Sequence, residues 1–295
     1  MKNLYFHWSS EIYGLGTCYR RIAKYPKFLP LFFTSDHGVC SAKSMKNYST
    51  EPKPFSFFHL TWTSWIARKE NHWESAKGVV RIKHPYFLVK PKLRNDKRFK
   101  FIYYPSHDVP GFQIFGLEDE DLINKLQQAQ VDINDLAVSV FVSDSREYMR
   151  QFKNLFPTVS AGASMDPGFF DNLFSIINNC EVIVSQNLGS QVFYGLALGK
   201  KIIFLNTGLK VLKDGQVAYQ SEDDAEIFRI ISEGEGIEDE CLIPTLLNDW
   251  LGLNAKCSRL RIFLIVWSSL FLVGLPFLFT RIWDWLIRRI KLAFR

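Results

Sequence analysis

Residues 182–206, VIVSQNLGSQVFYGLALGKKIIFLN, carry the clearest structural signal in the chain. Val182–Val184 is short and aliphatic, as is typical of a central strand that is buried on both faces. A small polar loop follows, and Ser190 can cap a short helix that Gly199 can end in the left-handed conformation. The helix leads into a second apolar strand. The segment therefore predicts a strand, a polar loop, a helix and a strand of an α/β sheet.

The polar loop, SQNLGSQ, is a candidate anion site. The first amides of a helix have no partner within the helix, and together with the helix dipole they favour a phosphate or a carboxylate. Open α/β sheets bind ligands outside the carboxyl ends of their strands, where this loop would lie. The loop therefore favours an anionic ligand, and the alternative is a capped helix that binds nothing.

Strands and helices alternate through the second half of the chain, and this spacing favours a parallel sheet with crossover helices. The first hundred residues alternate short apolar strands with loops, and the basic, proline-containing stretch 81–100 is typical of a linker. We therefore expect an α/β protein with a domain boundary near residues 95–100. The expected strands are 4–8, 31–34, 57–60, 87–89, 101–104, 137–142 and 158–160, and the expected helices are 18–23, 118–130, 146–154 and 169–178.

The composition is that of a folded protein. The chain has 295 residues, of which 47% are hydrophobic and 22% are charged, so two cores are expected. Its five cysteines form no CxxC pair, which argues against a disulfide framework and a zinc ribbon and fits a reducing compartment. The N-terminus lacks the pattern of a secretion signal, so we expect the body of the protein in the cytoplasm.

Charge is divided unevenly along the chain. Lys and Arg outnumber Asp and Glu by 19 to 6 over residues 1–100 and by 8 to 1 over residues 251–295, whereas residues 101–250 hold 9 basic and 23 acidic side chains. This separation indicates that the first and last blocks face something anionic. Nucleic acid is one candidate partner. An anionic membrane or a phosphorylated lipid is favoured, because the last block is also hydrophobic.

Residues 262–280, IFLIVWSSLFLVGLPFLFT, form a charge-free run of 19 residues, long enough for a transmembrane helix of roughly 20. Basic residues flank the run on both sides, so a single crossing would leave one cluster on the wrong face. Gly274 and Pro276 would bend or break a helix here. A re-entrant or interfacial anchor is therefore favoured over a span and over a helix packed on its own domain. Beyond the run, residues suited to the lipid headgroup layer repeat at helical spacing: Ile282, Trp285, Leu286, Arg289 and Leu292.

The order of elements across residues 101–206, and above all SQNLGSQVFYGLALGKKIIFLN, resembles the nucleotide-sugar half of two-domain GT-B glycosyltransferases that build bacterial capsule and lipopolysaccharide. The likeness covers roughly residues 100–210, and the N-terminal hundred residues match only in general layout. The resemblance implies two Rossmann-like lobes, with a loop and a helix of the second lobe holding the donor. The donor-contacting residues that it implies are His107, Ser185, Asn187, Gly189, Ser190 and Gln191.

Two short motifs extend the likeness into the first half. SDHG, residues 35–38, resembles the acidic motif ending in Gly of some sialyl- and octulosonyl-transferases (sialyl- or Kdo-transferase-like). His84-Pro85 resembles their His-Pro motif, although it lies before the expected domain boundary instead of inside the second lobe.

An inverting sugar transfer needs a base for the acceptor hydroxyl and positive groups or helix N-termini for the leaving phosphate. Asp36 or His37, at the end of a first-lobe strand, is the expected base, and Glu11 is a second candidate. Ser-Asp-His-Gly also makes a good turn, which is the structural alternative. The histidines show no HxxxH or HxH spacing, so we expect no metal site and no cofactor besides the donor. The residues expected at the acceptor or a phosphate are Gly14, Gly16 and Arg20.

The sequence therefore predicts a metal-independent, inverting glycosyltransferase. It would move a sugar from a nucleotide sugar, with CMP-linked sugars among the candidates, to a phosphorylated glycolipid of the lipopolysaccharide core or capsule. The enzyme would lie on the cytoplasmic face of the inner membrane, bound to anionic lipid through residues 256–295, with no nucleic-acid partner. The expected domains are the acceptor-side lobe 1–98, the nucleotide-sugar lobe 99–252 and the membrane anchor 253–295. The alternatives are a non-catalytic, membrane-attached sugar-binding protein with a degenerate transferase fold, and a sugar-nucleotide epimerase.

Overall fold

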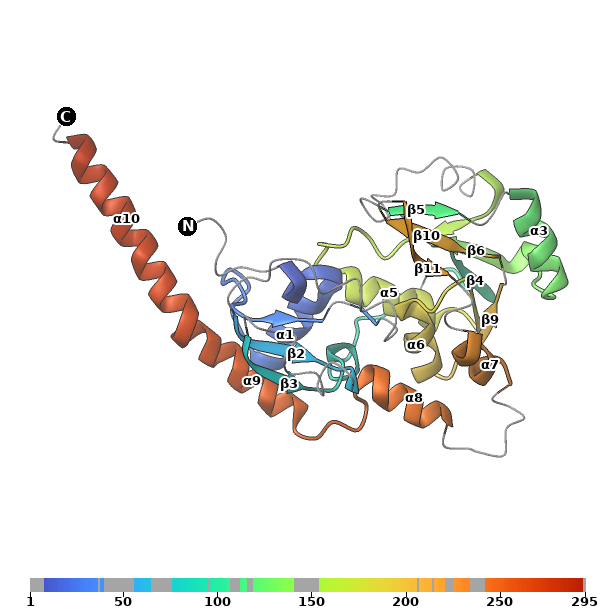
Figure 1. Cartoon of the computed structure of the whole chain (residues 1–295), viewed down its shortest axis with the longest axis horizontal. Coiled ribbons are helices and arrows are strands. Elements are labelled where there is room, and N and C mark those ends of the chain that lie inside the picture. Colours follow the sequence, from blue (N-terminus) through green and yellow to red (C-terminus); the bar gives the residue numbers. More distant parts are fainter. Residues whose placement is uncertain are drawn as a thin grey trace.

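The structure is a computed structural model in which two parallel sheets lie side by side and a long helix leaves the body at the C-terminus (Figure 1). The strand expected at 4–8 and the helix expected at 146–154 lie outside the described residues except for their last positions, and so do His37 and His107. The described residues are 8–36, 38–39, 56–64, 76–94, 96–106, 112–115, 119–140, 154–205, 207–213, 215–220, 225–233 and 242–293.

The larger sheet has five parallel strands in the order β7-β6-β4-β8-β9. Counted along the chain within this sheet, the order is 3-2-1-4-5, which is that of doubly wound α/β sheets. The direction of winding reverses between β4 and β8, whose last residues Tyr104 and Ser185 pair with each other. Ligands of such sheets bind at this reversal. The strands are β4 (Phe101–Tyr104), β6 (Leu136–Ser139), β7 (Thr158–Val159), β8 (Val182–Ser185) and β9 (Lys201–Phe204).

The helix after β8 begins at residue 190 as expected, but Ser190 is its first helical residue and not its cap: the N-cap is Gly189, and Ser190 Oγ accepts a hydrogen bond from the Val39 N–H. α6 (Ser190–Ala197) follows the polar loop, and Gly199 lies just beyond its end with a φ of 71°. Gly195 allows α6 to lie close to β8, because a Cβ there would be 2.3 Å from Cδ1 of Ile183. The expected helices at 118–130 and 169–178 are also confirmed. The helices that accompany α6 are α3 (Asp119–Gln128), α5 (Phe169–Asn178), α7 (Ala225–Glu233) and α8 (Leu242–Leu251), with the 3₁₀ turn η6 (Ile133–Asp135).

The first sheet has three parallel strands, β1 (Thr34–Ser35), β2 (Ser56–Thr61) and β3 (Ala76–Arg81). The strand expected at 87–89 is wrong: Pro85 opens a 3₁₀ turn, η5 (Pro85–Phe87), whose Tyr86 amide donates to the His84 side chain. The α/β class with parallel sheets is therefore confirmed, whereas the three described strands do not define a second Rossmann-like lobe. The helical elements before β1 are η1 (Trp8–Ser10), η2 (Ile12–Gly14) and α1 (Leu15–Ala23).

A small antiparallel sheet, which the sequence analysis did not anticipate, lies beside the larger one (Figure 1). Its order is β11-β10-β5, and β10 pairs with both neighbours. The strands are β5 (Phe112–Phe115), β10 (Lys210–Lys213) and β11 (Gln216–Gln220).

The halves of the chain share a core. One hydrophobic cluster joins buried residues of α1, the first sheet, α5, α6 and the C-terminal helix, and a second cluster fills the opposite face of the five-stranded sheet. The two expected cores are thus divided by a sheet, not by the midpoint of the chain. The stretch expected as a linker begins inside the shared core, because Ile82 and Tyr86 are 0% and 2% exposed. Its charged residues lie mainly after position 89, where the chain is more exposed.

The C-terminal helix is continuous where a break was expected. α9 (Ser258–Ser269) passes through a π turn, Leu270–Gly274, into α10 (Leu275–Ala293). Gly274 lets the helix approach the segment that leads into β1, since a Cβ there would be 2.5 Å from the Phe32 ring. One side of α9 is buried against the body, mainly on α1, while α10 projects away from it (Figure 1). The helix is thus partly a core helix of its own domain.

Candidate functional site

The carboxyl end of β1 lies against the amino end of α6. The Val39 N–H, three residues beyond Asp36, donates to Ser190 Oγ over 2.7 Å. Gly38 has a φ of 88°, and a Cβ at Gly38 would be 2.9 Å from the same hydroxyl oxygen, so this close approach favours glycine. The structure thereby brings together the SDHG turn and the SQNLGSQ loop, two regions that the sequence singled out separately.

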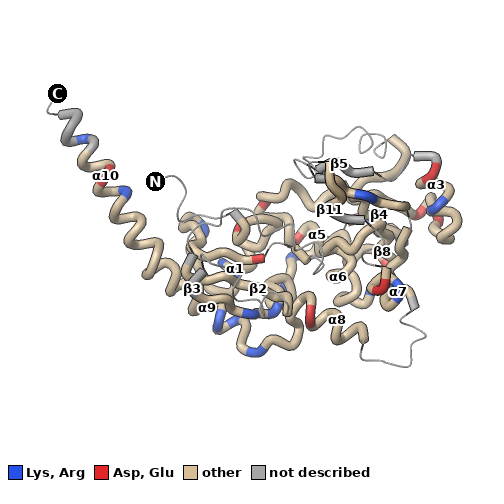
Figure 2. The backbone as a smooth tube through the Cα atoms, in the orientation of Figure 1, with Lys and Arg blue, Asp and Glu red and all other residues tan. Residues whose placement is uncertain are grey.

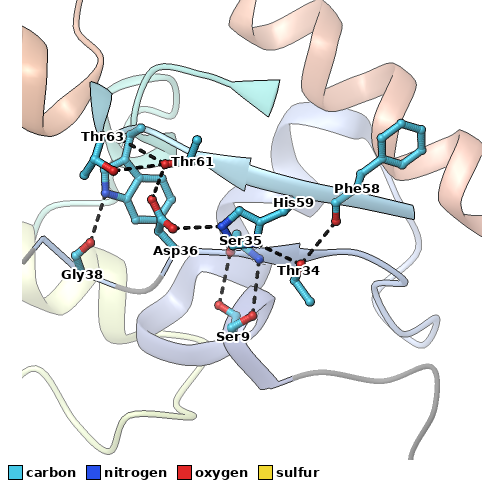
Figure 3. A network of polar contacts seen from close by, with 10 residues as sticks. Ser9, Thr34, Ser35, Asp36, Gly38, Phe58, His59, Thr61 and Thr63 are labelled. Carbon is cyan, nitrogen blue, oxygen red and sulfur yellow. Dashed lines mark hydrogen bonds and ion pairs between the residues drawn. The ribbon is translucent and has the colours of Figure 1, made fainter. Parts of the chain in front are cut away.

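Asp36 is held by a network of buried polar side chains (Figure 3). Its Oδ1 lies 3.0 Å from His59 Nε2, and its Oδ2 accepts a hydrogen bond of 2.6 Å from Thr61 Oγ1. The His59 side chain is 1% exposed and that of Asp36 is 8% exposed. Because a carboxylate can only accept, His59 Nε2 carries the proton of this pair. The other ring nitrogen lies 3.0 Å from Thr34 Oγ1, so the imidazole is fixed on both sides.

The turn that carries Asp36 is fixed from two further directions. Ser35 donates to Ser9 through both its backbone N–H and its hydroxyl. Trp62 Nε1, on the residue after β2, donates to the Gly38 carbonyl over 3.0 Å (Figure 3). The orientation of the carboxylate is therefore set by the protein before any ligand arrives, which is the property required of a general base.

Uncharged polar side chains gather at the reversal between β4 and β8. Asn187 Nδ2 donates to Ser106 Oγ over 2.8 Å, which links the ends of the two strands. Ser185 Oγ donates to the Asn187 carbonyl and accepts from Gln191 Nε2. These side chains are engaged with one another, so an anion at this loop would be bound by the first-turn amides of α6, which begins after Gly189.

A buried hydroxyl at the same edge has no hydrogen-bond partner among the residues that the structure describes. Thr207 follows β9 and is 8% exposed, and its Oγ1 finds no hydrogen-bond partner among the described residues. The Leu205 N–H donates to the Ser185 carbonyl, which places this segment beside the polar loop. A buried hydroxyl without a partner costs free energy that a ligand could recover. The sequence analysis missed Thr207, because an isolated Thr after a strand gives no signal.

Glu11 and Arg20, expected as a base and as an acceptor contact, form a bidentate ion pair with each other. The Arg20 nitrogens lie 2.6 and 2.7 Å from the two carboxylate oxygens, and the guanidinium also donates to the Leu29 carbonyl. Gly16 lies against this pair, since a Cβ there would be 2.0 Å from Glu11 Oε2. Gly14, with a φ of 75°, lies against the Phe170 backbone. Glu11, Gly16 and Arg20 therefore have a structural explanation within the first half, and Gly14 has one in its contact with α5 of the second half.

His84 of the His-Pro motif lies in the shared core, not at a surface that a donor could reach. It is 0% exposed, its Nδ1 accepts from the Tyr86 amide, and its Nε2 lies 3.1 Å from the Tyr194 hydroxyl. Burial lowers the pKa of His84 well below its usual range, so the ring is neutral. The motif therefore serves packing between η5 and α6, and the suggested similarity in role does not hold here.

His59 and Thr61 are the network members that sequence reasoning missed. They belong to FFHLTWT, where alternate residues of a strand point to the same face, and this spacing was the available signal. The pairing of β1 with β2, which brings His59 opposite Thr34, was not readable from the sequence. His37 and His107 lie outside the described residues. Within the described part of the chain, no group of three or more His, Cys, Asp and Glu side chains is placed to hold a metal ion.

A scan against models of protein families finds no match to this chain, and a search of curated proteins finds no relative.

Proposed function

We propose that the protein is a glycosyltransferase of the GT-B kind, which moves a sugar from a nucleotide sugar to a membrane glycolipid. One observation carries the proposal. The hydrogen bond from Val39 to Ser190 joins a preorganised buried carboxylate, Asp36, to the amino end of a helix at the reversal point of a doubly wound sheet. A base and an anion site side by side are the two elements that an inverting transfer requires.

The donor phosphate is assigned to the first-turn amides of α6. The helix supplies partial positive charge and N–H donors to the leaving phosphate. The nucleotide would then extend over the ends of β4 and β8, where Ser106 and Asn187 offer polar atoms and Thr207 offers a hydroxyl that has no partner in the described part of the chain. Residues 101–250 carry a net negative charge, so they would bind the donor phosphate through the local dipoles of backbone amides and not through net positive charge.

Asp36 is assigned as the base. It takes the proton from the acceptor hydroxyl while that oxygen forms a bond to the anomeric carbon, and the bond from this carbon to the donor phosphate breaks. The bonding electrons leave with the phosphate of the nucleotide. His59 and Thr61 position the carboxylate without touching the substrate, because both are almost fully buried. Each carboxylate oxygen has a second lone pair with which to accept the proton.

The acceptor is assigned to a phosphorylated glycolipid on the cytoplasmic face of the membrane. The strongly basic first hundred residues support an anionic acceptor. Basic residues are frequent along the backbone where α9 begins, beside the first sheet, whereas acidic residues lie mainly in the second half of the chain (Figure 2). The long apolar C-terminal helix supports a membrane location.

Thermal protection by CMP-, UDP- and GDP-sugars, followed by transfer assays with lipopolysaccharide-core or capsule glycolipids in detergent, tests the proposal. Asp36→Asn keeps the shape of the side chain and should lower turnover at least about a hundredfold while leaving donor protection intact. The matched control is Asp121→Asn on the exposed side of α3, which should behave as wild type.

Three results would count against this assignment. Full turnover by Asp36→Asn would show that Asp36 is not the base. Donor protection without transfer to any glycolipid would favour a sugar-binding protein. Conversion of the nucleotide sugar without an acceptor would favour an epimerase.

A further inference from the structure

The body of the protein holds the first part of the long C-terminal helix. On α9 and the π turn, one face is almost fully buried, with Ile262 and Ser269 at 0% and Val273 at 3% exposure. Trp267 Nε1 donates to the Ala23 carbonyl at the end of α1. This part of the helix cannot enter a bilayer without exposing the core of the first half.

The part that projects from the body is too short to cross a bilayer. Of the charge-free run 262–280, only residues 275–280 lie beyond the π turn, and Arg281 and Asp284 follow. Six helical residues rise about 9 Å, whereas the hydrocarbon core of a bilayer is about 30 Å thick. The length of the whole helix therefore gives a misleading indication of a membrane span.

The helix has two faces that continue from α9 into α10. The buried Val273 and the half-buried Phe277 share a helical face with Thr280, Arg281 and Asp284, at spacings of three and four residues. The face toward the body therefore continues as the polar stripe of the projecting part. On the opposite side the apolar residues are exposed along the whole length, and the exposed apolar face comprises Leu260, Phe263, Leu264, Phe271, Leu272, Phe279, Ile282, Trp283, Trp285 and Leu286.

Most of the large apolar side chains that are exposed in the described part of the chain lie on this face. Ten of the sixteen large apolar side chains that are exposed among the described residues lie on it, so it needs a cover. Its tryptophans suit the boundary between acyl chains and headgroups. Arg289, whose guanidinium lies 5.0 Å from the Trp285 ring centre, can reach lipid phosphates from the same face. Exposed Lys256, Arg259 and Arg261 supply positive charge at the other end.

We propose that α9 and α10 lie in the plane of one leaflet of an anionic membrane, with the exposed apolar face among the lipids. The polar stripe and the body of the protein then face water on the same side. The anchor neither crosses the bilayer nor re-enters it. This mode of binding goes beyond the proposed glycosyl transfer and does not depend on it, because lipid binding is measured without donor or acceptor.

Sedimentation of the full chain with vesicles of phosphatidylglycerol and phosphatidylcholine tests the anchor. Phe279→Ser combined with Ile282→Ser removes two side chains of the apolar face and should lower the partition coefficient at least about tenfold. Arg281→Ser combined with Asp284→Ser is the matched control, because it changes the polar stripe by two serines without changing net charge. This control should alter partitioning less than about twofold. All four side chains are exposed, so the melting temperature should stay unchanged.

Labelling of single cysteines with a membrane-impermeant maleimide then distinguishes the orientation. Cysteines placed at 280, 281 and 284 should react in the vesicle-bound protein, and cysteines at 279, 282 and 286 should be protected. Uniform protection across these positions would indicate a crossing helix and overturn the proposal. Wild-type protein that stays in the supernatant, or an apolar-face variant that loses self-association instead of vesicle binding, would also overturn it.

Discussion

Gly189→Asp is the sharpest test of the anion site at α6. Gly189 is the N-cap, with φ −73° and ψ 165°, a conformation that aspartate adopts readily, and the nearest obstacle to a Cβ is the flexible Gln191 side chain. A capping carboxylate stabilises a helix start by a few tenths of a kcal/mol relative to glycine, and the helix dipole adds about 0.3–1 kcal/mol. The folded protein should therefore lose no stability.

Donor binding should respond in the opposite direction. The new carboxylate would occupy the amides that are assigned to the donor phosphate. Two unit charges about 4 Å apart repel by about 4 kcal/mol at an effective dielectric constant of 20, so a hundredfold loss of affinity is a conservative estimate. At a donor concentration of about 100 Kd, protection amounts to about 2.7 kcal/mol, and a hundredfold weaker Kd reduces it to about 0.4 kcal/mol.

Thermal unfolding with and without the protecting nucleotide sugar measures this loss directly. The donor-induced shift should fall from about 5 °C to about 1 °C for a protein of this size. Gly189→Ser is the matched control, since serine caps the helix without a charge and should preserve most of the shift. If both variants bind the donor as wild type does, the start of α6 is not the phosphate site.

Three other substitutions test the structural assignments. Glu11→Gln should lower the free energy of unfolding by about 1–3 kcal/mol, because it breaks the partly buried pair with Arg20. Turnover per folded molecule should stay unchanged. Lost turnover at unchanged stability would support Glu11 as the base. Gly252→Ala should lower the free energy of unfolding, measured with denaturant, by more than about 3 kcal/mol, since its Cβ would be 2.4 Å from a backbone oxygen at a φ of 60°. Gly208→Ala is the control, because Gly208 has the same φ but open space around it, and it should lower that free energy by only about 1–2 kcal/mol. Because the pKa of His84 is lowered in the folded state, the unfolded chain binds the extra proton, so stability should fall by about 1.4 kcal/mol per pH unit below about 6.5. His84→Gln should flatten that slope, and an unchanged slope would place the titration elsewhere.

The five-stranded sheet of the second half could be predicted well because its signals are local, whereas the antiparallel sheet beside it was missed. The aliphatic run 182–184, the polar loop and Gly199 each specify one step of the chain, and the structure follows them closely. The first half depends on contacts between distant segments. β1 has two residues and owes its existence to pairing with β2, and no periodicity marks so short a strand. β3 was missed because AKGVVR has no strict alternation.

The candidate site shows the same division. Asp36 was readable, since it follows an apolar run and precedes a glycine. His59 was not, because a single histidine inside a strand acquires meaning only when pairing places it beside a carboxylate. The charge pattern led to wrong predictions of burial in two segments. The basic character of residues 81–100 obscured the burial of their first part, and the charge-free run 262–280 obscured the buried side of α9.

The packing of α9 on α1 has a consequence for how this chain is made. The ribosome releases the first hundred residues long before residues 258–274, so the first half keeps an uncovered apolar surface until α9 has been synthesised. A shortened protein that ends before Ser258 would keep that surface permanently and should aggregate. One that ends just after Gly274 keeps the core of the first half covered and loses the part of the exposed apolar face that lies on α10, so it should aggregate less than the chain that ends before Ser258. The π turn is therefore the boundary up to which the C-terminal helix is needed for the body to fold.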